Sequence, residues 1–296
     1  MRVILFMLVT PHQLSRSRAL ILGGTRLAPH TRILTMSSAP VNEMEESVRL
    51  VSPAKNERIG KVLMLHGWAQ NAWAFQSKSK GLTKKINQAG YDCVFLEGPH
   101  VLPMTSTIQI EGTPVEVENG KRENARSWFL LSQEDPADAT LSQSETPMEY
   151  IGLDDSLQIL KKELEGDHQY CAIFGFSQGG VFAHILSVLA MQECDNAFQR
   201  IKCAIIASGF AAQHESNQDS PFRLCQLASL KIALPSLHII GEKDVSVRPE
   251  LSMKLVNLFE ESQVMKHDKG HLLPQKSAQC AEIISFLNHN LPVFSP

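Results

Sequence analysis

Short apolar runs that alternate with helical patterns, from Lys61 onward, are the feature that most restricts the folds open to this chain. The runs show no polar–apolar alternation, which is typical of strands buried on both faces of a parallel sheet. The predicted strands are Lys61–Leu65, Tyr91–Leu96, Tyr170–Phe174, Ile201–Ala207, Leu237–Ile240 and a segment near Ser262–Met265.

Helical patterns lie between these runs. Leucines at positions 153, 157, 160 and 164 share one helix face, and similar apolar stripes follow Pro249 and Pro274. Alternating strands and helices predict an α/β fold with a mostly parallel, doubly wound sheet and helices on both faces. We assign residues 58–296 to this one domain. Residues 101–148 lack a clean period, and we interpret them as a mobile excursion above the ends of the strands.

The first 57 residues are expected to be a disordered N-terminal extension outside this domain. Residues 1–42 contain five arginines and no carboxylate, a composition typical of a mitochondrial or plastid transit peptide. A short apolar stretch after Arg2 leaves a secretory signal as another reading. Alternatively, translation starts at Met36, and the protein is expected in the cytoplasm, with the nucleus as a second compartment. The sequence leaves these localisations open.

Charge and composition exclude several functional classes. The net charge of −3 gives no basic field that would attract nucleic acid. No apolar run reaches the length of about 18 residues that a membrane-spanning helix needs. The cysteines and histidines show no zinc-binding spacing, and no cofactor motif stands out, so we expect neither a metal nor an organic cofactor.

A candidate nucleophile lies in the turn Gly175-Phe176-Ser177-Gln178-Gly179, directly after a predicted strand and before a predicted helix. A strand-to-helix turn this tight forces its serine into a strained conformation and exposes the hydroxyl at the carboxyl end of the sheet. Glycines on both sides allow the strand and the helix to approach closely. The pattern predicts that Ser177 is the nucleophile of a hydrolase.

Two later loops offer the groups that would activate Ser177. In this architecture the partners follow in the order serine, acid, histidine. Asp244 follows the predicted strand Leu237–Ile240, and Glu242 is the alternative acid. His271 follows Gly270 and directly precedes the last helix, so we predict that it is the base.

Acyl transfer also needs fixed N–H groups that bind the oxyanion. The backbone N–H of Gln178, the residue after the nucleophile, is one candidate. The other is the backbone N–H of Trp68, after the turn at Gly67. We attribute His66 to turn structure alone. Four aromatic residues are candidate walls of an acyl pocket: Trp73, Phe75, Trp128 and Phe129.

Six segments together resemble one family, the FSH family of serine hydrolases (the ovarian-tumour-associated serine hydrolase type), within the α/β-hydrolase superfamily. They are LHGWAQNAWAF (65–75), FLEGPH (95–100), RSWF (126–129), GFSQGG (175–180), PSLHIIGEKD (235–244) and KGHLLP (269–274). The resemblance implies a Ser-Asp-His triad, which falls on Ser177, Asp244 and His271. It also implies a carboxylesterase that acts on small-molecule acyl esters, with thioesters as further substrates.

Two other functions are compatible with the sequence. GFSQGG is also typical of acyl-protein thioesterases and the related phospholipase/carboxylesterase family. A non-catalytic α/β-hydrolase scaffold used for binding is the alternative outside enzymes, although such scaffolds usually lack a member of the triad. Labelling by an activity-based probe would distinguish an enzyme from a scaffold.

Overall fold

The computed structural model describes residues 59–102, 105–110, 113–118, 124–131, 149–166, 170–192, 196–213, 222, 224, 227 and 229–291. The predicted N-terminal extension, residues 1–57, lies outside these ranges, as do residues 132–148 of the predicted excursion. No helix in the described part of the chain is both long and apolar enough to cross a membrane.

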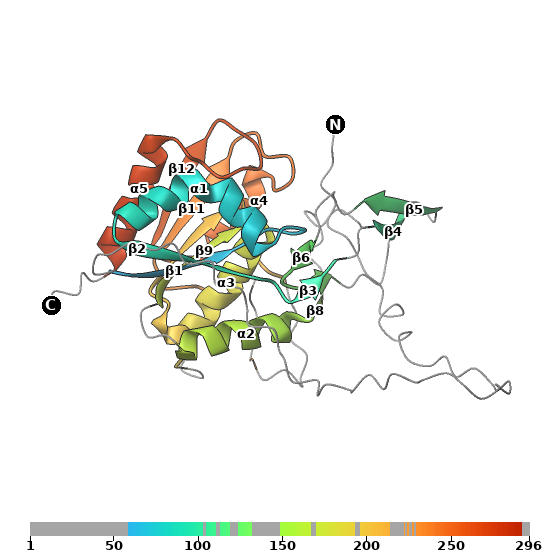
Figure 1. The fold of residues 1–296 in the computed structure, drawn as a ribbon, viewed down its shortest axis with the longest axis horizontal. Coiled ribbons are helices and arrows are strands. Elements are labelled where there is room, and N and C mark those ends of the chain that lie inside the picture. Colours follow the sequence, from blue (N-terminus) through green and yellow to red (C-terminus); the bar gives the residue numbers. More distant parts are fainter. Residues whose placement is uncertain are drawn as a thin grey trace, which may run out of the picture.

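A six-stranded parallel sheet in the order β12-β11-β10-β9-β1-β2 forms the centre of the molecule (Figure 1). The predicted doubly wound sheet is therefore confirmed. Because all six strands are parallel, their carboxyl ends lie at one edge, where such folds place their ligands. The strands of this sheet are β1 (Gly60–Leu65), β2 (Tyr91–Leu96), β9 (Tyr170–Phe176), β10 (Cys203–Ala207), β11 (Ser236–Gly241) and β12 (Ser262–His267).

Helices cover both faces of the sheet, with α1 and α5 on one side and α2 and α3 on the other (Figure 1). Their bounds are α1 (Ala72–Gln88), α2 (Leu153–Gly166), α3 (Gln178–Met191), α4 (Pro249–Val256) and α5 (Ser277–Asn290), with a short 3₁₀ helix at Phe198–Arg200. The predicted apolar stripes fall on α2, α4 and α5.

Two hydrophobic clusters hold these layers together. Successive residues of a strand point to opposite faces of the sheet and so pack alternately in one cluster and the other. Val62 and Met64 of β1 pack in the cluster that includes α1 and α5, whereas Leu63 and Leu65 pack in the cluster that includes α2 and α3. Each fully buried large apolar side chain contributes about 2 kcal/mol to the free energy of folding. The continuous apolar runs in the sequence are explained by burial on both faces of the sheet.

The excursion contains short antiparallel strand pairs rather than an aperiodic loop in its described parts. The sequence analysis missed them because most are two residues long and cannot show a period. They are β3 (His100–Val101) with β6 (Arg126–Ser127), β4 (Thr105–Ile110) with β5 (Thr113–Glu118), and β7 (Leu130–Leu131) with β8 (Tyr150–Ile151). A single bridge between Gln70 and Arg126 brings this region to the loop after β1.

Candidate active site

Ser177 occupies the sharp turn between β9 and α3, with φ 55° and ψ −117°. A positive φ is strained for a residue with a Cβ, and such strain clusters at functional sites. The flanking glycines are needed by space: a Cβ on Gly175 would overlap the carbonyl of Gly179, and one on Gly179 would overlap the carbonyl of Leu65. The Ser177 side chain does not cap α3. The turn therefore has the geometry expected of a nucleophile elbow.

Asp244 and His271 form a direct pair at the same edge of the sheet. His271 Nδ1 lies 2.7 Å from Asp244 Oδ2, and the side chains are 13% and 1% exposed. The other carboxylate oxygen accepts the backbone N–H groups of Ser246 and Val247, each at 2.9 Å. An aspartate on Nδ1 fixes the tautomer of a neutral imidazole and leaves Nε2 as the basic nitrogen.

The pKa of the Asp244 carboxyl reflects opposing effects. Burial acts to raise it, but the hydrogen bond and charge of His271 and the N–H of Val247 outweigh burial, and the pKa lies below its usual value. Asp244 is therefore an anion at neutral pH. An anionic carboxylate beside Nδ1 favours the positive imidazolium that forms when the histidine takes a proton.

Ser177 and His271 come from strands that are not neighbours, yet the fold brings them to one place. The ring of Phe176, the residue before Ser177, lies 4.9 Å from the ring of His271. The loop that carries His271 is held against the loop after β11, because the Lys243 N–H donates to the Lys269 carbonyl at 3.1 Å. The predicted acid and base are thus in direct contact, and the base lies beside Phe176, the residue before the predicted nucleophile, at the carboxyl edge of the sheet.

The loop after β1 passes directly beside the nucleophile. A Cβ on Gly67 would lie 3.2 Å from the Cβ of Ser177, so only a glycine backbone fits comfortably there. Trp68 follows, and Ala69 has a positive φ of 53° before the chain enters α1. This path brings the backbone of Trp68, the predicted oxyanion donor, close to the elbow. Gln178, the other predicted donor, is the first residue of α3.

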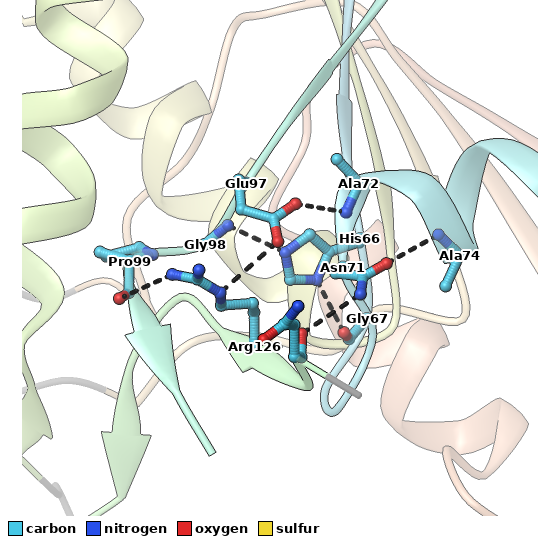
Figure 2. A network of polar contacts seen from close by, with 10 residues as sticks. His66, Gly67, Asn71, Ala72, Ala74, Glu97, Gly98, Pro99 and Arg126 are labelled. Atoms are coloured by element: carbon cyan, nitrogen blue, oxygen red, sulfur yellow. Dashed lines mark hydrogen bonds and ion pairs between the residues drawn. The ribbon is translucent and has the colours of Figure 1, made fainter. Parts of the chain in front are cut away.

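His66 is more than the turn residue that the sequence suggested (Figure 2). Its Nε2 accepts the Gly98 N–H at 3.0 Å, so the proton must reside on Nδ1, which donates to the Gly67 carbonyl at 2.9 Å. Burial lowers its pKa to about 4 against the opposing effect of the Gly67 hydrogen bond, and the charge of Arg126 lowers it further. His66 is thus a neutral crosslink between the loops after β1 and β2.

Glu97 fixes the start of α1 in the same network (Figure 2). Its Oε2 accepts the Ala72 N–H at 2.6 Å, and its Oε1 lies 3.5 Å from Arg126 Nε. Asn71 caps the helix by accepting the Ala74 N–H at 2.8 Å. Burial raises the pKa of Glu97 despite the opposing effects of the Ala72 N–H and Arg126. These contacts fix the far end of the Gly67–Asn71 loop.

Sequence reasoning missed these residues because their partners are distant in the chain. Gly98 is 32 positions from His66, and Ala72 is 25 positions from Glu97. The strings LHGW and FLEGP could have signalled them only as segments that follow neighbouring strands. No local period marks either side chain.

The predicted pocket walls divide into two groups. Trp73, in the first turn of α1, is 68% exposed. Phe75, Trp128 and Phe129 are buried and belong to the hydrophobic clusters. Phe75, Trp128 and Phe129 are thus at most 2% exposed, and the role of all four residues as walls of an acyl pocket stays a prediction. Within the described ranges, no cluster of three or more potential metal-ligating side chains is present.

Comparison with known proteins gives a consistent picture. A family model described as serine hydrolase (FSH1) matches residues 56–283. An esterase of Aedes aegypti is 27% identical over 90% of this chain and 85% of its own length. An esterase of Anopheles gambiae is 30% identical over 81% of each chain. Esterase OVCA2 of Danio rerio is 27% identical over 77% of this chain and 96% of its own.

Solved structures show the same fold at lower identity. Esterase PE8 superposes with a TM-score of 0.53 and 19% identity, over 83% of this chain and all of its own. Acyl-protein thioesterase 2 of Zea mays gives a TM-score of 0.50 at 16% identity, with the same coverage of both chains. At these identities the likeness shows the α/β-hydrolase architecture alone.

Proposed function

Since the chain belongs to the serine hydrolase (FSH1) family, and is therefore a hydrolase of the esterase type, we propose that it cleaves acyl esters through a triad of Ser177, His271 and Asp244. The observation that carries the proposal is the pairing of a strained serine turn with an Asp244–His271 hydrogen bond of 2.7 Å at the same edge of the sheet. This is the arrangement that activates a serine.

In the acylation step, His271 Nε2 takes the proton of Ser177 Oγ while Oγ attacks the acyl carbon. The carbonyl electron pair moves onto oxygen, and the resulting oxyanion accepts hydrogen bonds from the backbone N–H groups of Trp68 and Gln178. When the intermediate collapses, the alcohol or thiol leaves with the proton from His271. The acyl group is then bound to Ser177 as an ester.

In the deacylation step, His271 takes a proton from water as the water oxygen attacks the acyl-enzyme. Collapse of the second intermediate releases the carboxylic acid, and Ser177 Oγ recovers its proton from His271. Asp244 stays ionised throughout and stabilises the imidazolium. Every proton is accounted for within the triad and water, so the cycle needs no metal or organic cofactor.

We propose small-molecule acyl esters as the substrate class, with thioesters as an extension. The names of the three relatives described above, each an esterase, support the ester, and the exposed ring of Trp73 beside the loop after β1 could support an acyl chain. A series of p-nitrophenyl esters and acyl thioesters of increasing chain length would rank these substrates by kcat/KM.

The direct test is Ser177→Ala. We expect kcat for a p-nitrophenyl ester to fall by roughly 10⁶, as when the nucleophile is removed from a comparable hydrolase, and fluorophosphonate labelling to disappear. The matched control is Ser187→Ala on the same helix, where the hydroxyl donates to the Ala183 carbonyl at 2.7 Å. This control should keep labelling and turnover. Labelling that persists in Ser177→Ala would reject Ser177, and a wild-type protein that is neither labelled nor active would favour a binding scaffold.

A further inference from the structure

The two proposed oxyanion donors come from separate elements that must be held at a fixed distance. Trp68 follows β1 and Gln178 begins α3. Both lie beyond Leu65 and Gly175, the last residues that pair β1 with β9, and beyond Phe176, which pairs with Ala207 of β10. Sheet hydrogen bonds therefore end before they reach either donor. Something else must set the separation of the two N–H groups, because a misplacement of about 1 Å at such a site costs about 100-fold in rate.

Trp128 contacts both the end of β1 and the first residue of α3. Its indole Nε1–H donates to the His66 carbonyl at 2.8 Å, two residues before Trp68. Its backbone N–H donates to Gln178 Oε1 at 3.0 Å. The Gln178 side chain also donates from Nε2 to the Phe129 carbonyl at 2.8 Å. Three hydrogen bonds thus connect the loop after β1 to the first residue of α3 through Trp128 and Phe129. We call Trp128 and the Gln178 side chain the brace.

The brace is buried and cannot exchange its partners with water. Trp128, His66 and Gln178 are each at most 1% exposed. A buried carbonyl or amide without a hydrogen-bond partner costs about 1–3 kcal/mol. Breaking any of these three hydrogen bonds in the folded protein is therefore unfavourable. The single indole N–H of Trp128 and both the oxygen and the nitrogen of the Gln178 amide are hydrogen-bonded.

Packing fixes Trp128 itself. Its ring stacks on Phe182 of α3 at 5.0 Å and lies 4.9 Å from the ring of His66. The Ser156 hydroxyl of α2 donates to its carbonyl. On the other side of the segment, the Arg126 N–H donates to the Gln70 carbonyl at 2.8 Å, in the same loop as Trp68. The segment 126–129 is therefore held by α2, by α3 and by the loop that it supports.

We propose that Trp128 and the Gln178 side chain are positioning residues that set the separation of the Trp68 and Gln178 amides. This inference rests on the proposed acyl-transfer function. Neither side chain touches substrate, since both are buried; they act on the transition state through the two amides. Their loss should weaken binding of the oxyanion and leave binding of the uncharged ester unchanged.

Trp128→Phe tests the inference with a small change, because it removes the indole N–H and retains a ring that can stack on Phe182. We expect kcat to fall about 10- to 100-fold with KM within about twofold of wild type, less than the loss from deleting an oxyanion donor outright. Affinity for a boronic acid, which forms a tetrahedral adduct on Ser177, should fall by a similar factor. A merely structural role would leave both values unchanged in the folded variant.

The matched control is Tyr91→Phe, at the amino end of β2. It also removes one hydrogen-bond donor from a fully buried aromatic side chain, the Tyr91 hydroxyl that donates to Asn288 Oδ1 at 2.9 Å. Its kcat and boronic acid affinity should match those of wild type. A fall of kcat in this control equal to that of Trp128→Phe would overturn the inference, since any lost buried hydrogen bond would then suffice.

Gln178→Met is the second variant and keeps the backbone N–H while removing both side-chain bonds. We expect a similar loss of kcat, and we expect the double variant with Trp128→Phe to lose less than the product of the two single losses, because the residues act as one unit. Wild-type kcat in both single variants would overturn the inference and leave the triad intact. A wild-type protein that fluorophosphonate does not label would overturn the proposed function and the inference together.

Discussion

On the β1 and β9 side of Ser177, the supporting side chains are buried and hydrogen-bonded to main chain: His66 to Gly67 and Gly98, and Gln178 to Trp128 and Phe129. On the β11 and β12 side, the supporting loops reach solvent. Val245 follows Asp244 directly and is 85% exposed, and Leu272 follows His271 and is 44% exposed. The side chains of Asp244 and His271 themselves are 1% and 13% exposed, and Val247 in the same loop as Asp244 is buried.

This contrast matches the tasks proposed for the two sides. An oxyanion is stabilised by dipoles that are already in place, so the donors belong in a packed and water-excluded setting. A base must take a proton, hold it as a charge and return it twice in each cycle, and one ionised partner suffices for that. One edge of the sheet therefore combines a packed β1 and β9 side, proposed to bind the oxyanion, with a more open β11 and β12 side, proposed to transfer the proton.

The largest expected effect comes from loss of the Asp244–His271 hydrogen bond on the β11 and β12 side. Asp244→Asn should lower kcat by about 10⁴, because the amide no longer selects the tautomer or stabilises the imidazolium, while circular dichroism stays that of wild type. Ester turnover by the purified variant measures it. The control is Asp268→Asn, which changes an exposed acid between β12 and His271. Its kcat should stay within twofold of wild type. If Glu242→Gln shows the loss instead, Glu242 is the acid.

The next effect, of medium size, is a loss of stability at acidic pH that arises from His66 on the β1 and β9 side. Burial holds the pKa of His66 at about 4, below the ordinary 6.5, so between these values the unfolded chain binds a proton that the folded chain does not. The free energy of unfolding is therefore highest above pH 6.5 and decreases as the pH falls towards 4, by up to about 3 kcal/mol. Urea unfolding of wild type and His66→Gln at pH 7, 5.5 and 4.5 measures it. The variant should show a shallower fall, and equal pH dependence would contradict the role given to His66.

The smallest effect sharpens the comparison within one loop. Val245→Ala should change the free energy of unfolding by less than about 0.5 kcal/mol, because the side chain is exposed. Val247→Ala, two residues on and 2% exposed, should cost about 2 kcal/mol through lost burial. Urea unfolding of both variants gives the difference. Equal costs would show that Val245 is packed in solution and that the open side is more closed than described.

The sequence predicted the elements whose signals are local. Continuous apolar strands, the Gly-x-Ser-x-Gly turn and a histidine before the last helix each occupy a few neighbouring residues, and they were enough to predict the sheet and the hydrogen-bonded Asp244–His271 pair at its edge. Trp128 shows the limit. Its aromatic ring suggested a pocket wall, yet its hydrogen-bond partners, His66 and Gln178, lie 62 and 50 positions away in the chain, and only the fold reveals these contacts. The two-residue strands β3, β6 and β7 escaped prediction for a similar reason, since such short strands depend on their partners rather than on a period.

The strand order has a consequence for the time at which activity can appear during synthesis. β10 lies between β9 and β11, and β12 at the edge brings His271 only when nearly the whole chain has left the ribosome. A nascent chain that ends before β11 already carries Ser177 and the segments that support both amides, but it lacks Asp244 and His271, the proposed acid and base. Under the proposed mechanism such an intermediate would not hydrolyse esters, and activity would begin only when the last strand has joined the sheet.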